Sequence, residues 1–175
     1  MFISVSKLKM DKGTYQKYHF SFPLSYFGLE EKIGWFTVDF YGAYLKGKVF
    51  IKGECRISQE GYCDRCLKPM QIEQEETFDQ EFTEVYEEEM AKQEEYKDFW
   101  GEEYLKFSGD DLNLVEYFRQ LIITSAPLKK VCSHDCKGLC QICGKPLEEG
   151  CYCEKTQVDP RWLALEKLKQ NIDVN

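Results

Sequence analysis

Cys132-Ser-His-Asp-Cys136-Lys-Gly-Leu-Cys140-Gln-Ile-Cys143-Gly144, followed by a short loop to Cys151-Tyr-Cys153, is the most distinctive stretch of this 175-residue sequence. Residues 132–153 contain six cysteines, and two more lie far upstream in Cys63-Asp-Arg-Cys66. A hydrophobic core has no need for thiols at these intervals. A tetrahedral metal ion such as Zn²⁺ takes four thiolates, and a Cys-x-x-Cys turn presents two of them to one ion. The sequence therefore predicts that metal organises this part of the chain.

The spacing favours two separate four-sulfur sites. In the Cys140-x-x-Cys143 knuckle, Gly144 can adopt the positive φ that the chain reversal needs, and the Cys-x-Cys pair nearby can complete the site. Two downstream cysteines are then left over, and the upstream Cys-x-x-Cys is their only remaining partner. The predicted sites are Cys63, Cys66, Cys132 and Cys136 (site 1) and Cys140, Cys143, Cys151 and Cys153 (site 2).

Other readings of the thiols stay open at this point. One site alone can form with the remaining cysteines unligated, and an iron–sulfur cluster is a second possibility. A redox pair at Cys63 and Cys66 is disfavoured, because Pro69 and strand-like residues follow where a thioredoxin-like motif opens a helix. Neither predicted site leaves a ligand position for water, so the two Zn²⁺ ions are expected to be structural and to contribute roughly 10 kcal/mol or more to folding.

Composition indicates an ordered cytoplasmic protein. The chain is 43% hydrophobic and 15% aromatic, which is enough for a core. Residues 1–13 lack the apolar segment of a signal peptide, and no run reaches the ~18 apolar residues of a membrane span. Nine cysteines in a reducing compartment favour metal ligation over disulfides. No membrane partner is expected.

The net charge of −8 is unevenly distributed. Residues 73–103 hold 14 acidic and 2 basic side chains, a local charge of −12, so the remainder of the chain carries +4. Two four-thiolate zinc sites would together add −4. Such a chain does not coat phosphate backbones by bulk electrostatics. Any RNA contact is expected to be local or to run through a protein partner.

The N-terminal half is predicted to be β. Short β-branched and aromatic runs at 2–5, 18–22, 35–41 and 48–57 alternate with Gly and Pro, and residues 71–88 continue the pattern. A bend is expected between Gly42 and Gly47. The predicted fold class is α+β, with a small antiparallel β-barrel or sandwich and a C-terminal helical lobe stapled to it by zinc.

Three regions follow from this pattern. Residues 1–87 form a β-rich domain that carries the first Cys-x-x-Cys, and residues 88–107 form an acidic linker or mobile segment. Residues 108–175 hold a helix capped by Asp110 or Asp111, the cysteine knuckles, and a last helix that starts at Asp159-Pro160; this region is expected to pack on the β domain. The first helix is predicted to bury Leu112, Val115, Phe118 and Ile122 on one stripe.

No residues suggest catalysis. The sequence has no Ser/His/Asp arrangement, no Gly-rich phosphate loop and no internal repeat, so an enzyme with a small-molecule substrate is not expected. Cys55 is predicted to be a small buried hydrophobe within a strand. His19 is expected to be a structural residue of its strand, and His134 a solvent-facing loop residue.

Taken together in order, five pieces of the sequence resemble a known family. These are Cys63-Asp-Arg-Cys66-Leu67, Ser125-Ala126-Pro127, the run from Cys136 to Gly144, Cys151-x-Cys153 and Asp159-Pro160-Arg161-Trp162. The combination is similar to the bacterial YceD family, the large ribosomal RNA subunit accumulation proteins, over nearly the whole chain. Gln141 replaces a common Pro and Pro146-Leu147 a common Asn-Leu, and neither change removes a ligand.

The resemblance implies a non-enzymatic protein that supports 23S ribosomal RNA accumulation through large-subunit biogenesis. Its implied partner is ribosomal RNA or a large-subunit assembly intermediate, bound directly or through a ribosomal protein. The candidate contact residues are Arg65, Lys68, Lys129, Lys130 and Lys137. The alternative is a redox-switched zinc chaperone or thiol sensor, because such proteins also use Cys-x-Cys and Cys-x-x-Cys pairs.

Overall fold

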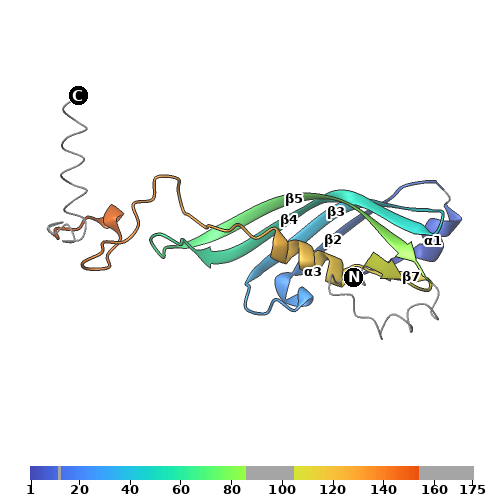
Figure 1. The fold of residues 1–175 in the computed structure, drawn as a ribbon, viewed down its shortest axis with the longest axis horizontal. Coiled ribbons are helices and arrows are strands. Elements are labelled where there is room, and N and C mark those ends of the chain that lie inside the picture. Colours follow the sequence, from blue (N-terminus) through green and yellow to red (C-terminus); the bar gives the residue numbers. More distant parts are fainter. Residues whose placement is uncertain (12, 86–104, 154–175) are drawn as a thin grey trace, which may run out of the picture. The chain divides into compact units, whose positions relative to one another are not determined.

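The computed structural model describes residues 1–11, 13–85 and 105–153, and the chain divides into two compact units, Met1–Cys132 and Ser133–Asn175 (Figure 1). Residues 88–104 of the acidic linker expected at 88–107, and the last helix expected from Asp159, lie outside the described residues. Among the described helices, none is long and apolar enough to cross a membrane.

A five-stranded sheet forms the body of the first unit. Its order is β2-β3-β4-β5-β6, antiparallel throughout except for the parallel pair β5 and β6. The strands are β2 (Gln16–Pro23), β3 (Gly34–Leu45), β4 (Lys48–Tyr62), β5 (Pro69–Glu84) and β6 (Lys106–Phe107). A second sheet pairs β1 (Phe2–Ser4) with β7 (Asp111–Asn113).

The sheet is open, so the predicted barrel is wrong for the described residues. β2 and β6 are its two edges, and no ladder joins them. The reason is visible in the burial pattern of β4, where alternate residues from Val49 to Gln59 are buried except for Gly53, and all of those between them are exposed or half-buried. One face of the sheet is covered by other elements, so that face is buried without closure of the strands into a barrel.

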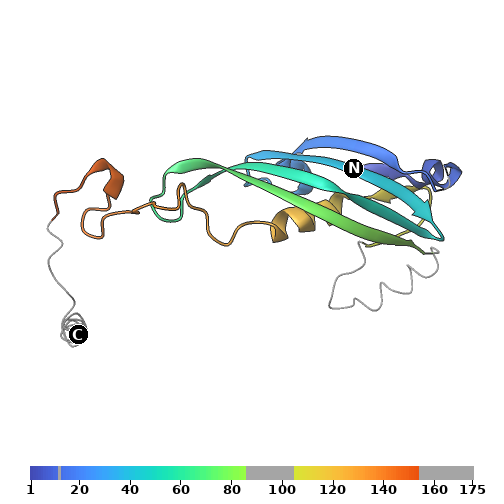
Figure 2. The same ribbon diagram turned by 90° about the horizontal axis from the view of Figure 1, so that it is seen from above.

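Helix α3 (Val115–Thr124) supplies the cover (Figure 2). The ring of Phe118 lies 5.2 Å from Phe36 of β3 and 5.3 Å from Phe78 of β5, measured between centroids. Gly53 of β4 is required at this face, because a Cβ there would lie 2.5 Å from the Cβ of Phe40. The aromatic layer therefore fixes α3 on the sheet.

Two helix predictions differ from the structure. The strand predicted at 2–5 ends at Ser4, and residues Val5–Met10 form helix α1, which was not predicted. Helix α3 begins at Val115, so neither expected capping residue, Asp110 or Asp111, lies at its start, and Asp111 belongs to β7. Pairing of β7 with β1 uses the backbone that an earlier helix start would have needed. Leu112, expected on the helix, is buried on β7 instead.

The turns between the long strands position the first cysteine pair. Lys46 and Gly47, both with positive φ, join β3 to β4 as a two-residue hairpin, whereas Gly42, expected at the bend, lies within β3. The β4–β5 hairpin pairs as far as Tyr62 and Pro69, so its loop consists of residues 63–68. Short 3-10 helices, η1 (Leu24–Phe27) and η3 (Leu147–Glu149), complete the described elements.

Candidate metal centres

The loop of the β4–β5 hairpin is a cysteine knuckle. The backbone N–H of Cys63 donates to the carbonyl of Lys68 at 2.9 Å, and that of Leu67 donates to the carbonyl of Cys63 at 2.9 Å. The N–H of Arg65 points at the Cys63 Sγ, 3.4 Å away. Leu67 adopts a φ of 59°, which closes the turn. This geometry turns the sulfurs of Cys63 and Cys66 to one side of the loop.

Backbone hydrogen bonds attach the chain around Lys130 to this knuckle. The N–H of Asp64 donates to the carbonyl of Lys130 at 2.7 Å, and the N–H of Lys130 donates to the Asp64 carboxylate at 2.6 Å. Two residues later, the N–H of Cys132 donates to the Cys63 Sγ at 3.4 Å. Cys132 is thereby placed beside a cysteine 69 positions earlier.

The four cysteines of site 1 come together. The sulfurs of Cys63, Cys66, Cys132 and Cys136 all lie within 4.8 Å of one another, and the sulfurs of Cys66 and Cys132 are 3.7 Å apart. A tetrahedral thiolate site with metal–sulfur bonds of about 2.3 Å has sulfurs about 3.8 Å apart. All but Cys132 are buried. The donor set fits a metal ion, and its occupancy stays a prediction.

The second knuckle repeats the first, hydrogen bond for hydrogen bond. The N–H of Cys140 donates to the carbonyl of Lys145, that of Gly144 donates to the carbonyl of Cys140, and that of Ile142 points at the Cys140 Sγ. Gly144 has a φ of 70°, the conformation expected for it. An antiparallel bridge between Leu139 and Pro146 closes the base of this loop.

The cysteines of site 2 also gather within 4.8 Å of one another. The sulfurs of Cys143 and Cys151 are 3.4 Å apart, and the N–H of Cys153 points at the Cys151 Sγ at 3.4 Å. Cys140 is buried, whereas Cys143 is exposed. This group therefore offers the same four donors as site 1, in a more open setting.

The electrostatics of the two groups favour a bound cation. Burial opposes ionisation of Cys63, but the backbone N–H groups of Cys132, Cys66 and Arg65 outweigh it and lower its pKa to about 6. The N–H groups of Cys143 and Ile142 lower the pKa of Cys140 to about 6 as well. Its neighbours cannot all follow, since four thiolates at this separation repel one another. A divalent metal would supply the positive charge that allows all four thiols to ionise.

The two knuckles share a short sequence repeat, so the expectation of no internal repeat is wrong. Residues 63–69 and 140–146 both read Cys-x-x-Cys-x-Lys-Pro. The lysine contributes its carbonyl to the turn in each case. The proline follows at the first position of β5 in one knuckle and in the Leu139 bridge in the other. Alignment of these seven residues would have predicted equal geometry for both.

Four of the five predicted contact residues lie around the first knuckle. Arg65 and Lys68 belong to its loop, and Lys129 and Lys130 belong to the segment that pairs with Asp64. Lys137 lies in the second unit. Arg65, Lys68 and Lys129 are exposed. The structure thus brings part of the predicted basic set to one corner of the first unit, and its contact with RNA stays a prediction.

The remaining thiol and the two histidines behave as expected. Cys55 is 3% exposed within the core, and burial raises its pKa to about 11. His19 lies on β2 with its Nδ1 3.0 Å from the Asp39 carboxylate. His134 is exposed and contacts Asp135. The described four-cysteine groups include none of these three residues.

Comparison with known proteins bears on this arrangement. The family model "Large ribosomal RNA subunit accumulation protein YceD" matches residues 51–169. The chain belongs to the YceD family. The match includes both knuckles, all eight cysteines of the two groups, and most of the region in which the sequence resemblance was noted.

Curated relatives add little about function. Uncharacterized proteins from Mycobacterium bovis and from two strains of Mycobacterium tuberculosis are each 26% identical over 120 residues, which is 69% of this chain. The aligned region covers 55% of each of those proteins, so the chain spans about half the length of the curated relatives it matches. No solved structure matches the chain.

Proposed function

We propose that this protein is a non-enzymatic, cytoplasmic zinc protein that supports accumulation of 23S ribosomal RNA during biogenesis of the large ribosomal subunit. The observation that carries the proposal is the pair of closed four-cysteine groups in a chain of the YceD family. Four thiolates complete the coordination of Zn²⁺ and leave no position for an activated water. The zinc ions would therefore stabilise the fold, and the protein would act by binding its partner and not by catalysis.

Complementation tests this role. In bacteria depleted of the native protein, the wild-type chain should restore the ratio of 23S to 16S ribosomal RNA, and Cys63→Ser should fail to restore it. Cys55→Ser is the matched control, because Cys55 lies in neither group. A normal 23S to 16S ratio in depleted cells, or full rescue by a Cys63→Ser, Cys143→Ser double variant, would contradict the proposal.

The proposed partner is ribosomal RNA or a large-subunit assembly intermediate, and the proposed contact residues are Arg65, Lys68, Lys129, Lys130 and Lys137. Charge reversal at Lys129, Lys130 and Lys137 should weaken association with precursor subunits, with a shallower dependence on salt. Sedimentation with precursor particles across a salt series measures this. Unchanged association of the triple variant would exclude these lysines as the contact.

One observation favours a second candidate function, a redox-switched zinc chaperone. Cys143 is exposed, and its sulfur lies 3.4 Å from that of Cys151. Exposed zinc-bound thiolates close to each other are suited to oxidation to a disulfide. Peroxide treatment with parallel measurement of zinc release and of anti-aggregation activity separates the two roles. Zinc release accompanied by anti-aggregation activity supports the chaperone, and association with ribosome precursors without that activity supports the assembly role.

A further inference from the structure

The face of the five-stranded sheet opposite α3 carries large exposed side chains. Trp35 and Tyr41 of β3 are 58% and 51% exposed, and Tyr62 at the end of β4 is 65% exposed. These positions alternate with the core residues of β3 and β4, so their side chains point away from the core. Of these three aromatic side chains, Tyr62 also lines a pocket.

Cross-strand ion pairs cover most of this face along β4 and β5. Lys48, Lys52 and Arg56 occur at four-residue intervals on β4 and contact Glu81, Asp79 and Glu75 of β5 at 2.5, 2.8 and 2.6 Å. The next position in the series is Glu60, which lies opposite Gln71. The pattern therefore ends with a carboxylate where a cation would be expected, facing an amide that carries no charge.

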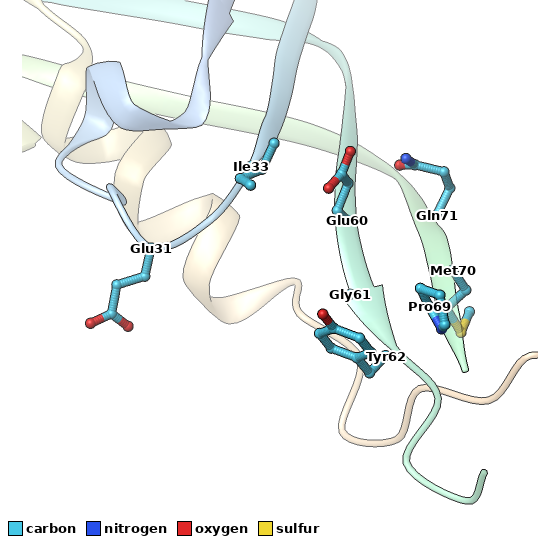
Figure 3. A pocket seen from close by; sticks show the side chains of 8 residues that line it. All are labelled: Glu31, Ile33, Glu60, Gly61, Tyr62, Pro69, Met70 and Gln71. Atoms are coloured by element: carbon cyan, nitrogen blue, oxygen red, sulfur yellow. The ribbon is translucent and has the colours of Figure 1, made fainter. Parts of the chain in front are cut away.

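A pocket of about 560 Å³ surrounds this unmatched carboxylate (Figure 3). It forms where the β4–β5 hairpin extends beyond the start of β3. Glu60 and Gln71 point the same way from neighbouring strands, with Tyr62 further along β4 (Figure 3). The lining has two carboxylates and no basic side chain; it consists of Glu31, Ile33, Glu60, Gly61, Tyr62, Pro69, Met70 and Gln71.

We propose that this pocket binds a lysine or arginine side chain of a basic protein segment. The inference rests on the proposed function, since it names the class of protein that a non-enzymatic assembly factor would hold. The incoming cation would give the Glu60 carboxylate the positively charged partner that it lacks on the sheet. Its aliphatic stem would lie against Ile33, whose carbonyl accepts the N–H of Glu60, and the ring of Tyr62 would face the charged group.

Charge selects a protein segment over nucleic acid at this surface. Glu31 and Glu60 would repel a phosphate backbone, and the cations on the neighbouring part of β4 are already engaged by carboxylates of β5. A pocket of this volume also suits one extended side chain with its flanking backbone. The surface is therefore complementary to a chain rich in lysine or arginine.

Peptide binding to the zinc-loaded full chain tests the proposal. The probe is a fluorescein-labelled peptide of alternating arginine and glycine, and a glutamate–glycine peptide is its control. Fluorescence anisotropy should show binding of the first peptide only. Glu60→Lys should weaken binding at least about tenfold, because it places like charges together. Tyr62→Ala should weaken it about threefold through loss of the ring.

Matched variants distinguish a pocket from general attraction. Asp111→Lys makes the same charge change on β7, at the other end of the first unit (Figure 1), and should alter affinity less than twofold. Glu60→Gln removes the charge with minimal change of shape and should also weaken binding, which guards against misfolding of Glu60→Lys. Equal zinc content and melting temperature verify that each variant is folded.

Several results would overturn the proposal. These are unchanged affinity in both Glu60 variants, equal weakening by Asp111→Lys, equal binding of the glutamate–glycine peptide, and direct binding of a labelled ribosomal RNA fragment that Tyr62→Ala weakens as much as it weakens peptide binding. The last result would assign the pocket to nucleic acid. Failure here leaves the 23S to 16S ratio of the cysteine variants untouched, so the proposed function is tested separately.

Discussion

The two cysteine knuckles have the same backbone conformation but differ in the surrounding chain that holds them in place. Both read Cys-x-x-Cys-x-Lys-Pro, and both close with the same pair of backbone hydrogen bonds. The first is the loop between strands of 15 and 16 residues and is further attached to Lys130. The second is closed by one isolated bridge and followed by a three-residue 3-10 helix.

Exposure of the sulfurs follows from this difference. Cys63 and Cys66 are 0% and 6% exposed, whereas Cys143 in the second knuckle is exposed. The heptapeptide thus determines how two thiolates are presented, while the surrounding chain determines how easily solvent, chelators and oxidants reach them. Site 1 is expected to be the more inert centre and site 2 the more labile one.

The largest expected effect comes from removing one ligand of each site. The wild-type protein should bind two zinc ions, and Cys63→Ser and Cys143→Ser should each bind one, as measured by metal analysis. Loss of a site removes on the order of 10 kcal/mol of binding free energy. Cys63→Ser should lower the melting temperature of the sheet more than Cys143→Ser, because its knuckle closes the β4–β5 hairpin.

The double variant and Cys55→Ser complete this test. The double variant should hold no zinc, and Cys55→Ser should hold two. Retention of two ions by either single variant would overturn the division of the eight ligands into site 1 and site 2. An equal fall in melting temperature for both single variants would contradict the unequal support of the two knuckles.

Release kinetics should separate the sites next. With a chromogenic chelator in excess, zinc should leave in two phases, and the fast phase should be absent from Cys143→Ser. The exposed sulfur of Cys143 permits attack by the chelator, so we expect the phases to differ at least about tenfold in rate. A single phase in the wild-type protein, or loss of the slow phase in Cys143→Ser, would show that exposure does not control release.

The two four-cysteine groups could be predicted from sequence because closely spaced cysteines are rare and a Cys-x-x-Cys turn is a local structure. Cys140, Cys143 and Gly144 fix their own turn, and that geometry depends on few distant contacts. Cys63 and Cys132 were matched by elimination alone. The hydrogen bonds that bring them together involve Asp64 and Lys130, whose sequence gives no sign of pairing.

The open sheet could not be predicted in the same way. Alternation within residues 48–57 specifies one buried face, but it does not specify whether a helix or further strands cover that face. The answer lies in long-range packing of Phe118 on Phe36 and Phe78. For the same reason helix α1 was missed, since the carbonyl of Asp110 accepts the N–H of Val5 at the point where the chain turns into the helix.

Cys55 is a useful reference for the cysteines of the two sites, because it is buried but belongs to neither four-cysteine group. Its pKa is raised to about 11, so at pH 8 nearly all of it is the unreactive thiol. Alkylation of the zinc-loaded protein should spare Cys55, and chelation should expose the other eight thiols without exposing it. Peptide mass mapping measures this, and rapid labelling of Cys55 in the folded protein would contradict its placement in the core.

The smallest effect concerns the fifth position of each knuckle, where the φ values are 59° at Leu67 and 70° at Gly144. A left-handed conformation costs a side-chain-bearing residue about 1–2 kcal/mol, and glycine avoids that cost. Leu67 is 62% exposed, so Leu67→Gly loses little packing and should stabilise the first knuckle by up to about 1 kcal/mol.

Gly144→Ala should weaken zinc binding at site 2 by about fivefold, although no atom lies within 4 Å of the added Cβ. Thermal unfolding measures the first change and competition with a chelator the second. If Leu67→Gly instead destabilises the protein, the exposed leucine makes a contact that the glycine of the second knuckle does not need, and the two turns are alike only in their backbone.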